Sequence, residues 1–346
     1  MEGNMYKRVP VEDSVGMVLG HDLTRIVQGE FKGPAFKKGH IIKAADIPLL
    51  LDMGKENIYV LDLKDGLVHE NDAAERIAKG AAGKAIRLSE PSEGRINFLA
   101  ATPGLLKIHV EALRQINMIN DVVLSTLHSN QQVTAGTAVA GTRIIPLATR
   151  DENIQQVECI CRDNFPVIDV KPFRPLNVGI ITTGSEVYSG RITDKFGPVL
   201  RAKFTELGCK VTKQVFVSDD IDMTVKAIHE LIREGNDLIA LTGGMSVDPD
   251  DQTPASIRAA GGKVVIYGAP VFPGAMFMLA YIGEIPVVGL PGCVMYYRAT
   301  IFDVVVPRII AGEDVTSQDI LSLGHGGFCA GCEDCRYPRC GFGKGC

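Results

Sequence analysis

Cysteines are concentrated at the C-terminal end of the chain, where their spacing suits metal binding. Five of the nine cysteines fall within the last 18 residues, in the pattern C-x2-C-x2-C-x4-C-x5-C. Thiolates two residues apart can bind one metal centre because a tight turn brings them together. Four thiolates suit a tetrahedral zinc ion, and three successive cysteines at this spacing also suit an iron–sulfur cluster. We expect the following residues to hold the metal: Cys329, Cys332, Cys335 and Cys340.

The segment that carries these cysteines is rich in glycine and poor in apolar residues. Glycine-rich chain is flexible when nothing cross-links it. The composition therefore predicts that residues 324–346 are mobile without metal, bind metal independently of the rest of the protein and add little to its core. The alternative to a zinc or iron–sulfur site is a flexible thiol segment with no fixed ion.

Acidic, hydroxyl and glycine residues also gather where four predicted strands end. These strands lead into residues 182–186, 218–220, 242–254 and 289–293. Glycines let the backbone approach a ligand and present N–H groups to an anion, and hydroxyls add neutral donors. Carboxylates hold Mg²⁺, which in turn binds phosphate. We therefore expect a phosphorylated ligand with a divalent ion, although each aspartate could instead be a helix N-cap.

The pattern of strands and helices around these four loops predicts that the loops lie close together in the fold. From residue 176 onward, short apolar strands alternate with helices of about 10–15 residues, which is typical of βαβ units. The predicted fold class is therefore α/β, a mostly parallel sheet with helices on both faces. In such a sheet, ligands bind at the carboxyl ends of the strands.

Shifts in composition predict four regions. An N-terminal α+β region covers residues 1–82, a β-rich mixed domain 83–175, the α/β domain 176–312 and the cysteine-rich tail 313–346. In the β-rich domain, residues 95–101 and 104–108 are predicted to form a hairpin, and residues 169–175 a stiff linker. Cys159 and Cys161 are predicted to share one face of a strand.

Overall composition excludes several functions. The formal net charge of −5 gives no basic surface for nucleic acid, and tryptophan is absent. No apolar stretch approaches the roughly 18 residues needed to cross a bilayer, and the first residues have no signal-peptide core. We expect a cytoplasmic protein that binds neither nucleic acid nor membranes.

Three motifs of the α/β region are similar, in order and spacing, to those of a known domain. They are Thr182-Thr183-Gly184-Ser185-Glu186-Val187, then Gly243-Gly244-Met245-Ser246-Val247 with Asp251, and then Leu290-Pro291-Gly292. In order and spacing they resemble the molybdopterin-binding domain, over about residues 176–312. That domain occurs in molybdopterin molybdotransferases, molybdopterin adenylyltransferases, gephyrin and competence-damage nicotinamide-nucleotide amidases.

The resemblance implies a protein of molybdenum cofactor biosynthesis, similar to a molybdotransferase, that handles an adenylylated pterin with Mg²⁺ and inserts molybdate. It implies molybdopterin or a related pterin phosphate as ligand, and we expect a homo-oligomer. By motif position, Asp251 matches the metal-binding, catalytic aspartate, and Asp219 matches an acidic position after the second strand. The implied pterin-binding residues are Thr183, Gly184, Ser185, Glu186, Thr242, Gly243, Gly244, Met245, Ser246, Asp250, Pro291 and Gly292.

Three positions depart from the molybdotransferase pattern. Ser185 stands where that pattern usually has Asp, Phe272 where it has Lys, and Cys293 where it has Asn. Cys293 lies at the start of a predicted helix, whose dipole favours a thiolate, although a small buried residue is the alternative. The departures keep open a non-catalytic pterin carrier or sensor with a metal-binding tail. A competence-damage-type nucleotide pyrophosphatase is a further alternative.

Overall fold

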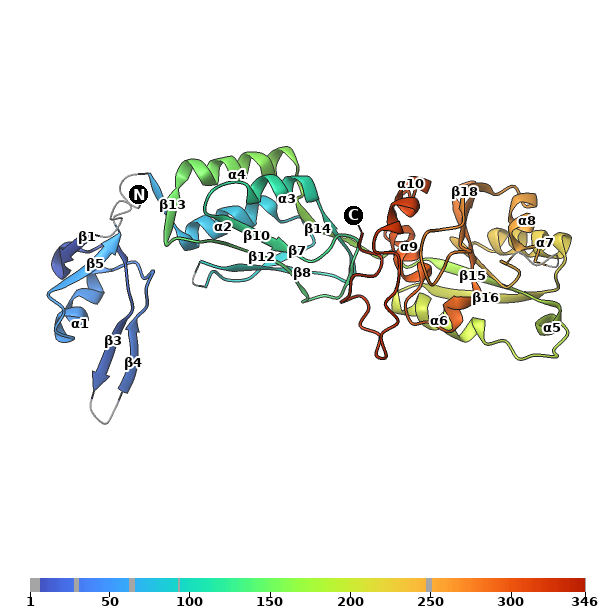
Figure 1. The fold of residues 1–346 in the computed structure, drawn as a ribbon, viewed down its shortest axis with the longest axis horizontal. Helices are drawn as coiled ribbons and strands as arrows, with labels where there is room; N and C mark the ends of the chain where they lie inside the picture. The colour runs from blue at the N-terminus through green and yellow to red at the C-terminus, as the bar shows by residue number, and fades with distance from the viewer. Residues whose placement is uncertain (1–6, 28–30, 62–65, 93, 247–250, 346) are drawn as a thin grey trace. The chain divides into compact units, whose positions relative to one another are not determined.

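A computed structural model describes residues 7–27, 31–61, 66–92, 94–246 and 251–345 (Figure 1). The chain divides into two units. Unit 1 comprises Met1–Ala101, Lys107–Leu127 and Ala135–Val170, and unit 2 comprises Thr102–Leu106, His128–Thr134 and Lys171–Cys346. Within the described ranges, every helix is too short or too polar to cross a membrane. The predicted division into four regions stays a prediction.

The first part of unit 1 consists of two small antiparallel sheets and short helices. One sheet has the order β1-β5-β2 and the other pairs β3 with β4. Their apolar side chains, among them Leu19, Leu50 and Ile58, form a separate small core. The elements are β1 (Lys7–Pro10), η1 (Val11–Asp13), β2 (Val18–Leu19), β3 (Leu23–Val27), β4 (Phe31–Phe36), η2 (Ala44–Asp46), α1 (Ile47–Asp52) and β5 (Asn57–Leu61).

The second part of unit 1 packs three helices on one side of a four-stranded sheet of order β10-β12-β8-β7 (Figure 1). Alanines on α2 are fully buried, which lets α4 pack closely against it. The elements are β6 (Leu67–His69), α2 (Glu70–Ala81), β7 (Ile86–Leu88), β8 (Ile96–Ala100), α3 (Val110–Asn117), β10 (Val122–Thr126), β12 (Ala138–Ile144), β13 (Ala148–Arg150), α4 (Asp151–Asp163) and β14 (Ile168–Pro172).

Three local predictions for this part of the chain are wrong. β8 and β9 (Gly104–Ile108) do not form a hairpin: β8 pairs with β7 and β12, whereas β9 pairs with β11 (Gln132–Val133). Residues 169–172 continue strand β14 rather than a linker. Cys159 and Cys161 lie on helix α4, where Cys161 is buried against Gly80 of α2. Burial raises the pKa of the Cys161 thiol to about 11.

Unit 2 contains the α/β fold expected from the sequence. Its six-stranded sheet has the order β16-β15-β17-β20-β19-β18. The first four strands in this order run parallel. β19 pairs antiparallel with β20, and β18 pairs antiparallel with β19. The sequence does not predict β19. The strands are β15 (Asn177–Thr183), β16 (Lys210–Val217), β17 (Leu238–Thr242), β18 (Lys263–Tyr267), β19 (Met278–Ile282) and β20 (Ile285–Leu290).

Helices cover both faces of this sheet because its central strands are apolar on both sides. Val178, Ile180 and Leu238 face a core with residues of α6 and α9. Ile181 and Ile239, from the opposite face, pack with residues of α7 and α8. The helices of the unit are α5 (Ser185–Tyr188), α6 (Phe196–Glu206), α7 (Ile221–Arg233), α8 (Thr253–Ala259), η3 (Gly292–Met295), α9 (Ile301–Ile310), α10 (Ser317–Leu321) and η4 (Ser322–Gly324).

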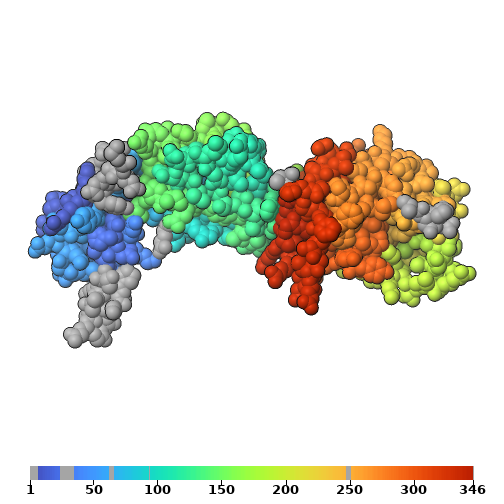
Figure 2. Space-filling view, in the orientation of Figure 1, coloured from blue at the N-terminus to red at the C-terminus, as the bar shows by residue number. Residues whose placement is uncertain are grey.

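The C-terminal cysteine segment, residues 325–345, is part of this packed unit. Phe342 is only 5% exposed and belongs to the core between the sheet and α9, and Tyr337 packs against the same core. Figure 2 shows the segment, in red, against the body of unit 2. The prediction that the segment adds little to the core is therefore wrong, because Phe342 is buried in that core and Tyr337 packs against it.

Candidate functional site

The four loops singled out in the sequence lie at one edge of the unit 2 sheet. They follow β16, β15, β17 and β20, which are neighbours in that order and run parallel. Parallel neighbours end at the same edge, so Thr183, Val217, Thr242 and Leu290 bring their following loops together. The parallel order of these four strands therefore places the four loops next to one another, as the sequence analysis predicts.

Ser185 joins the loop after β15 to the loop after β16. Its backbone N–H and its hydroxyl both donate to Oδ2 of Asp219, each at 2.9 Å. Its Oγ also lies 3.1 Å from Oγ of Ser218. Asp219 is therefore held in place by Ser185 rather than by capping a helix, whereas Asp220 caps α7 by accepting from the Met223 N–H at 2.7 Å.

Thr183 joins the loop after β15 to the loop after β17. Its Oγ1 lies 3.2 Å from Oγ1 of Thr253, which in turn donates to the Gly243 carbonyl oxygen at 2.8 Å. Gly243 has a φ of +89°, and a Cβ there would lie 2.2 Å from the Thr183 carbonyl oxygen. Only glycine therefore fits where these two loops touch.

Asp251 holds the second half of the loop after β17. Its Oδ2 accepts from the Ser246 N–H at 2.8 Å. Met245 lies buried beside the fourth strand, since a Cβ on Gly289 of β20 would be 2.7 Å from the Met245 sulfur. The Tyr267 hydroxyl also donates to the Met245 carbonyl oxygen at 3.2 Å. The described parts of this loop are thus held at Met245, Ser246 and Asp251.

The pterin-binding residues implied by the resemblance differ in exposure, and Gly184, Gly243 and Gly244 are half-buried. Ser185, Glu186, Ser246 and Gly292 are exposed, so a ligand can reach them. The side chains of Thr183, Thr242, Met245 and Pro291 are buried and position the loops instead. Within the described chain, the Thr242 hydroxyl is buried without a hydrogen-bond partner. Asp250 lies outside the described residues.

Two residues that the sequence analysis did not assign help to shape this site. Thr253 links Thr183 to Gly243, and its position before Pro254 was the available signal, since proline is common in a first helical turn. Gln214 of β16 donates to Thr182 Oγ1 at 3.0 Å and to Asp194 Oδ2 at 2.7 Å. Nothing in the sequence around Gln214 indicates that its side chain links Thr182 to Asp194, because the residue lies in an ordinary strand pattern.

Cys293 does not have the predicted thiolate environment. It lies in η3, a single short turn of 3₁₀ helix, and is half-buried. Burial raises the pKa of its thiol, which outweighs the opposing effect of a backbone hydrogen bond. Cys293 is therefore a neutral thiol near neutral pH, in agreement with the alternative of a small packed residue.

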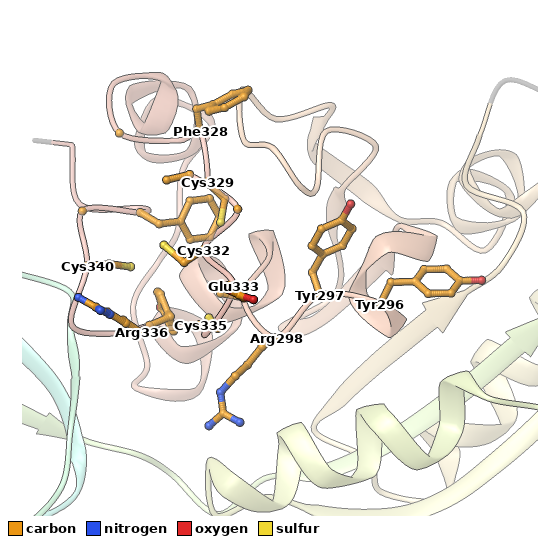
Figure 3. A pocket seen from close by; sticks show the side chains of 17 residues that line it. Tyr296, Tyr297, Arg298, Phe328, Cys329, Cys332, Glu333, Cys335, Arg336 and Cys340 are labelled. Carbon is orange, nitrogen blue, oxygen red and sulfur yellow. The ribbon is translucent and has the colours of Figure 1, made fainter.

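The four cysteines expected to bind metal line one cavity of about 570 Å³ in unit 2 (Figure 3). Tyr296, Tyr297 and Arg298, from the connection between η3 and α9, form part of its wall. Across the described ranges, no three His, Cys, Asp or Glu side chains are close enough together to hold a metal ion. The cysteines thus share a cavity without forming a closed ligand set.

The donors at the strand ends fit Mg²⁺ when it arrives with a phosphate. Asp219 and Asp251 each carry a carboxylate, Ser185 places its hydroxyl beside Asp219, and Ser246 is exposed. Mg²⁺ prefers oxygen ligands and usually binds through one or two carboxylates plus substrate phosphates, rather than in a cage made only of protein groups. A site with few carboxylates is therefore compatible with such an ion.

The sequence of this region matches a known family. Residues 179–311 match the model of a probable molybdopterin binding domain, so unit 2 contains a domain of this kind. Residues 8–62 match a domain of unknown function, DUF8806.

Curated relatives match a part of the chain. The chain is 29% identical over 131 residues to a molybdopterin molybdenumtransferase of Staphylococcus aureus (strain COL), covering 36% of this chain and 31% of the relative. It is 35% identical over 89 residues to a CinA-like protein of Mycobacterium sp. (strain JLS), covering 25% and 21%. The chain thus spans about a third or less of the length of these relatives.

Solved structures match over a similar stretch. The molybdopterin biosynthesis enzyme MoaB of Thermus thermophilus is 21% identical, with a TM-score of 0.33, covering 40% of this chain and 98% of that one. The tungsten cofactor synthesizing protein MoaB of Pyrococcus furiosus is 24% identical, with a TM-score of 0.30, covering 35% and 84%.

Proposed function

We propose that unit 2 binds a phosphorylated pterin, molybdopterin or its adenylylated form, at the four strand-end loops, and that the protein acts in molybdenum cofactor biosynthesis. The observation that carries this proposal is the coincidence of the family match over residues 179–311 with four neighbouring loops whose exposed groups are hydroxyls, glycines and carboxylates. Such groups recognise a phosphate together with a divalent ion.

In this proposal the protein is a molybdotransferase-like enzyme, with molybdate as its second substrate. Asp251 and Asp219 are the catalytic residues that hold Mg²⁺ against the phosphoanhydride of the adenylylated pterin. A bound Mg²⁺ would neutralise the charge that develops on the phosphate oxygens during cleavage. Ser185 keeps Asp219 in place through two hydrogen bonds, and Ser246 does the same for Asp251 through one.

A pterin carrier is the second candidate because specific contacts favour it. Phe272, which stands where molybdotransferases have a lysine, is 57% exposed, and its ring lies 6.5 Å from that of Phe328. Its backbone also bonds with Gly327 and Cys329. This position therefore supplies an aromatic surface and an anchor for the cysteine segment, rather than a cation for the ligand's phosphate.

The test is calorimetric titration of the full chain with molybdopterin, with and without Mg²⁺, followed by an assay for release of AMP from the adenylylated pterin with molybdate. We expect binding that Mg²⁺ strengthens, and AMP release for an enzyme. Binding without release would support the carrier. Cleavage of the pyrophosphate bond of a nucleotide sugar such as ADP-ribose instead would support a nucleotide pyrophosphatase. No binding under either condition would overturn the proposal.

A matched pair of variants makes the test specific to the site. Asp251→Asn removes a charge at the strand ends, whereas Glu206→Gln removes one from the exposed end of α6. The C-terminal end of α6 leads into the start of β16, so Glu206 lies away from the strand ends. Loss of Mg²⁺-dependent binding only in the first variant would support the assigned site.

A further inference from the structure

The cysteine segment is hydrogen-bonded to the rest of unit 2 at Gly327 and Cys329, where the cysteines begin. The Phe272 N–H donates to the Gly327 carbonyl oxygen, and the Cys329 N–H donates to the Phe272 carbonyl oxygen, each at 2.8 Å. These two bonds form a short parallel bridge between Phe272 and Phe328. The chain therefore enters the cysteine-rich stretch from a fixed position.

The segment is held again at Tyr337, between Cys335 and Cys340, and at Phe342 and Gly343, beyond Cys340. The Tyr337 hydroxyl donates to the Asp303 carbonyl oxygen at 2.7 Å, and the Phe342 side chain is buried in the core. The Gly343 N–H donates to the Gly326 carbonyl oxygen at 2.9 Å, so the loop returns to its own beginning. Residues 327–342 thus form a closed loop with both ends held.

Between these anchors the loop has no regular structure. Residues 329–345 form no helix or strand, and the side chains of Cys332 and Cys335 are exposed. A stretch of this kind has little apolar contact of its own to hold it in one conformation. Small domains that lack a core are commonly held by a structural metal.

All four cysteines line the same cavity, whose wall also includes Arg298, Arg336 and Glu333. Figure 3 shows Cys329, Cys332, Cys335 and Cys340 around the hollow, with Arg298 and Arg336 beside them. A lone structural cysteine would not have three further cysteines around the same cavity.

We propose that Cys329, Cys332, Cys335 and Cys340 ligate one thiolate-bound metal centre, zinc or an iron–sulfur cluster, inside this cavity. The sulfurs must move closer together when the centre binds, because no three potential ligands are within range of one ion in the described residues. Gly331, with a φ of +65° and open space around it, lies between the first two cysteines and allows that movement.

The cavity wall connects this centre to the pterin loops. Tyr296 and Tyr297 follow η3, which itself follows Pro291 of the strand-end motif. A centre that orders this wall would also steady the Pro291–Gly292 turn. This consequence rests on the proposed function, whereas the metal site itself does not.

The experiment measures metal in the full chain, purified without oxygen and then reconstituted with Zn²⁺ or with Fe²⁺ and sulfide. Zinc, iron and acid-labile sulfide are determined per chain, together with visible absorption. We expect one centre per chain: colourless with zinc, or brown with equal iron and sulfide. Cys332→Ser should lose most of it, and Cys159→Ser, at an exposed cysteine of α4, should keep it.

Thiol labelling gives a second readout that does not depend on the stability of the variants. In the loaded protein, Cys159 should react with a maleimide while the four cavity cysteines are protected, and a chelator or acid should expose them. No metal after both reconstitutions, equal metal in Cys332→Ser and the unmodified chain, or equal labelling with and without metal would each overturn the proposal. Pterin titration of the same samples separates this result from the proposed function.

Discussion

The strand-end loops and the cysteine segment belong to the same unit but are built differently. The strand-end loops follow neighbouring parallel strands, and their polar groups are already bonded to one another, as Ser185 is to Asp219. The cysteine segment has fixed ends and an irregular middle whose sulfurs are not assembled. The fold positions the polar groups of the strand-end loops, whereas the proposed metal centre would have to bring its sulfurs together on binding.

The largest expected effect concerns the site that the fold positions. Asp251→Asn should slow any phosphoanhydride cleavage by about a hundredfold or more, because metal stabilisation of developing charge contributes several kcal/mol. Circular dichroism and the urea midpoint should stay close to those of the unmodified protein, since Asp251 is only partly buried. A rate equal to that of Glu206→Gln would leave Asp251 with a purely structural role.

The next prediction compares the stability contributions of a buried and an exposed phenylalanine of the cysteine segment. Phe342→Ala should lower the free energy of unfolding by about 3–5 kcal/mol, as for other buried phenylalanines. Phe328→Ala is the control, because Phe328 is 78% exposed in the same segment and should cost far less. Chemical denaturation of both variants measures the difference. Equal and small losses would show that the segment is not packed as described.

A smaller effect should follow from replacing Ser185 by the residue typical of molybdotransferases. Ser185→Asp substitutes a carboxylate for the hydroxyl that donates to Asp219, so two like charges face each other. Like charges held close together favour cation binding. Pterin binding should therefore depend more steeply on Mg²⁺ than in the unmodified chain, as measured by titration at several Mg²⁺ concentrations. Ser185→Ala should not show this steeper dependence.

The smallest effect is a pH dependence near the start of the cysteine segment. Asp319 accepts from Arg308 at 2.8 Å and from Thr316. Burial raises the pKa of Asp319, but the hydrogen bonds from Arg308 and Thr316 outweigh it and lower the pKa to about 2. Because the folded-state pKa is depressed, this stabilisation is present above the ordinary value near 3.8 and is lost as pH falls toward 2. Asp319→Asn should flatten the stability profile over that range.

Much of unit 2 was predictable from the sequence because its signals are local. Apolar runs followed by Thr-Gly, Gly-Gly and Pro-Gly turns predict the strands, and their parallel pairing puts the ends together. The sequence does not predict β19 because residues 278–282 form an antiparallel strand between β18 and β20, which a short turn rather than a helix joins to β20.

The remaining errors arise where distant contacts decide the structure. β8 and β9 look like a hairpin locally, but each finds its partners elsewhere in the chain. Cys159 and Cys161 lie on a helix because α4 packs on the alanines of α2, which no short window reveals. Phe342 joins the core because Tyr337 and Gly343 are anchored to distant residues, Asp303 and Gly326.

The hydrogen bond from Gly343 to Gly326 has a consequence for oxidation. By closing the loop, it keeps the thiols of one chain at a high effective concentration relative to each other. When the metal-free protein is exposed to air, each cavity thiol meets a neighbour from its own loop far more often than one from another molecule. Oxidation should therefore produce disulfides within one chain, and the protein should keep its mass on a non-reducing gel.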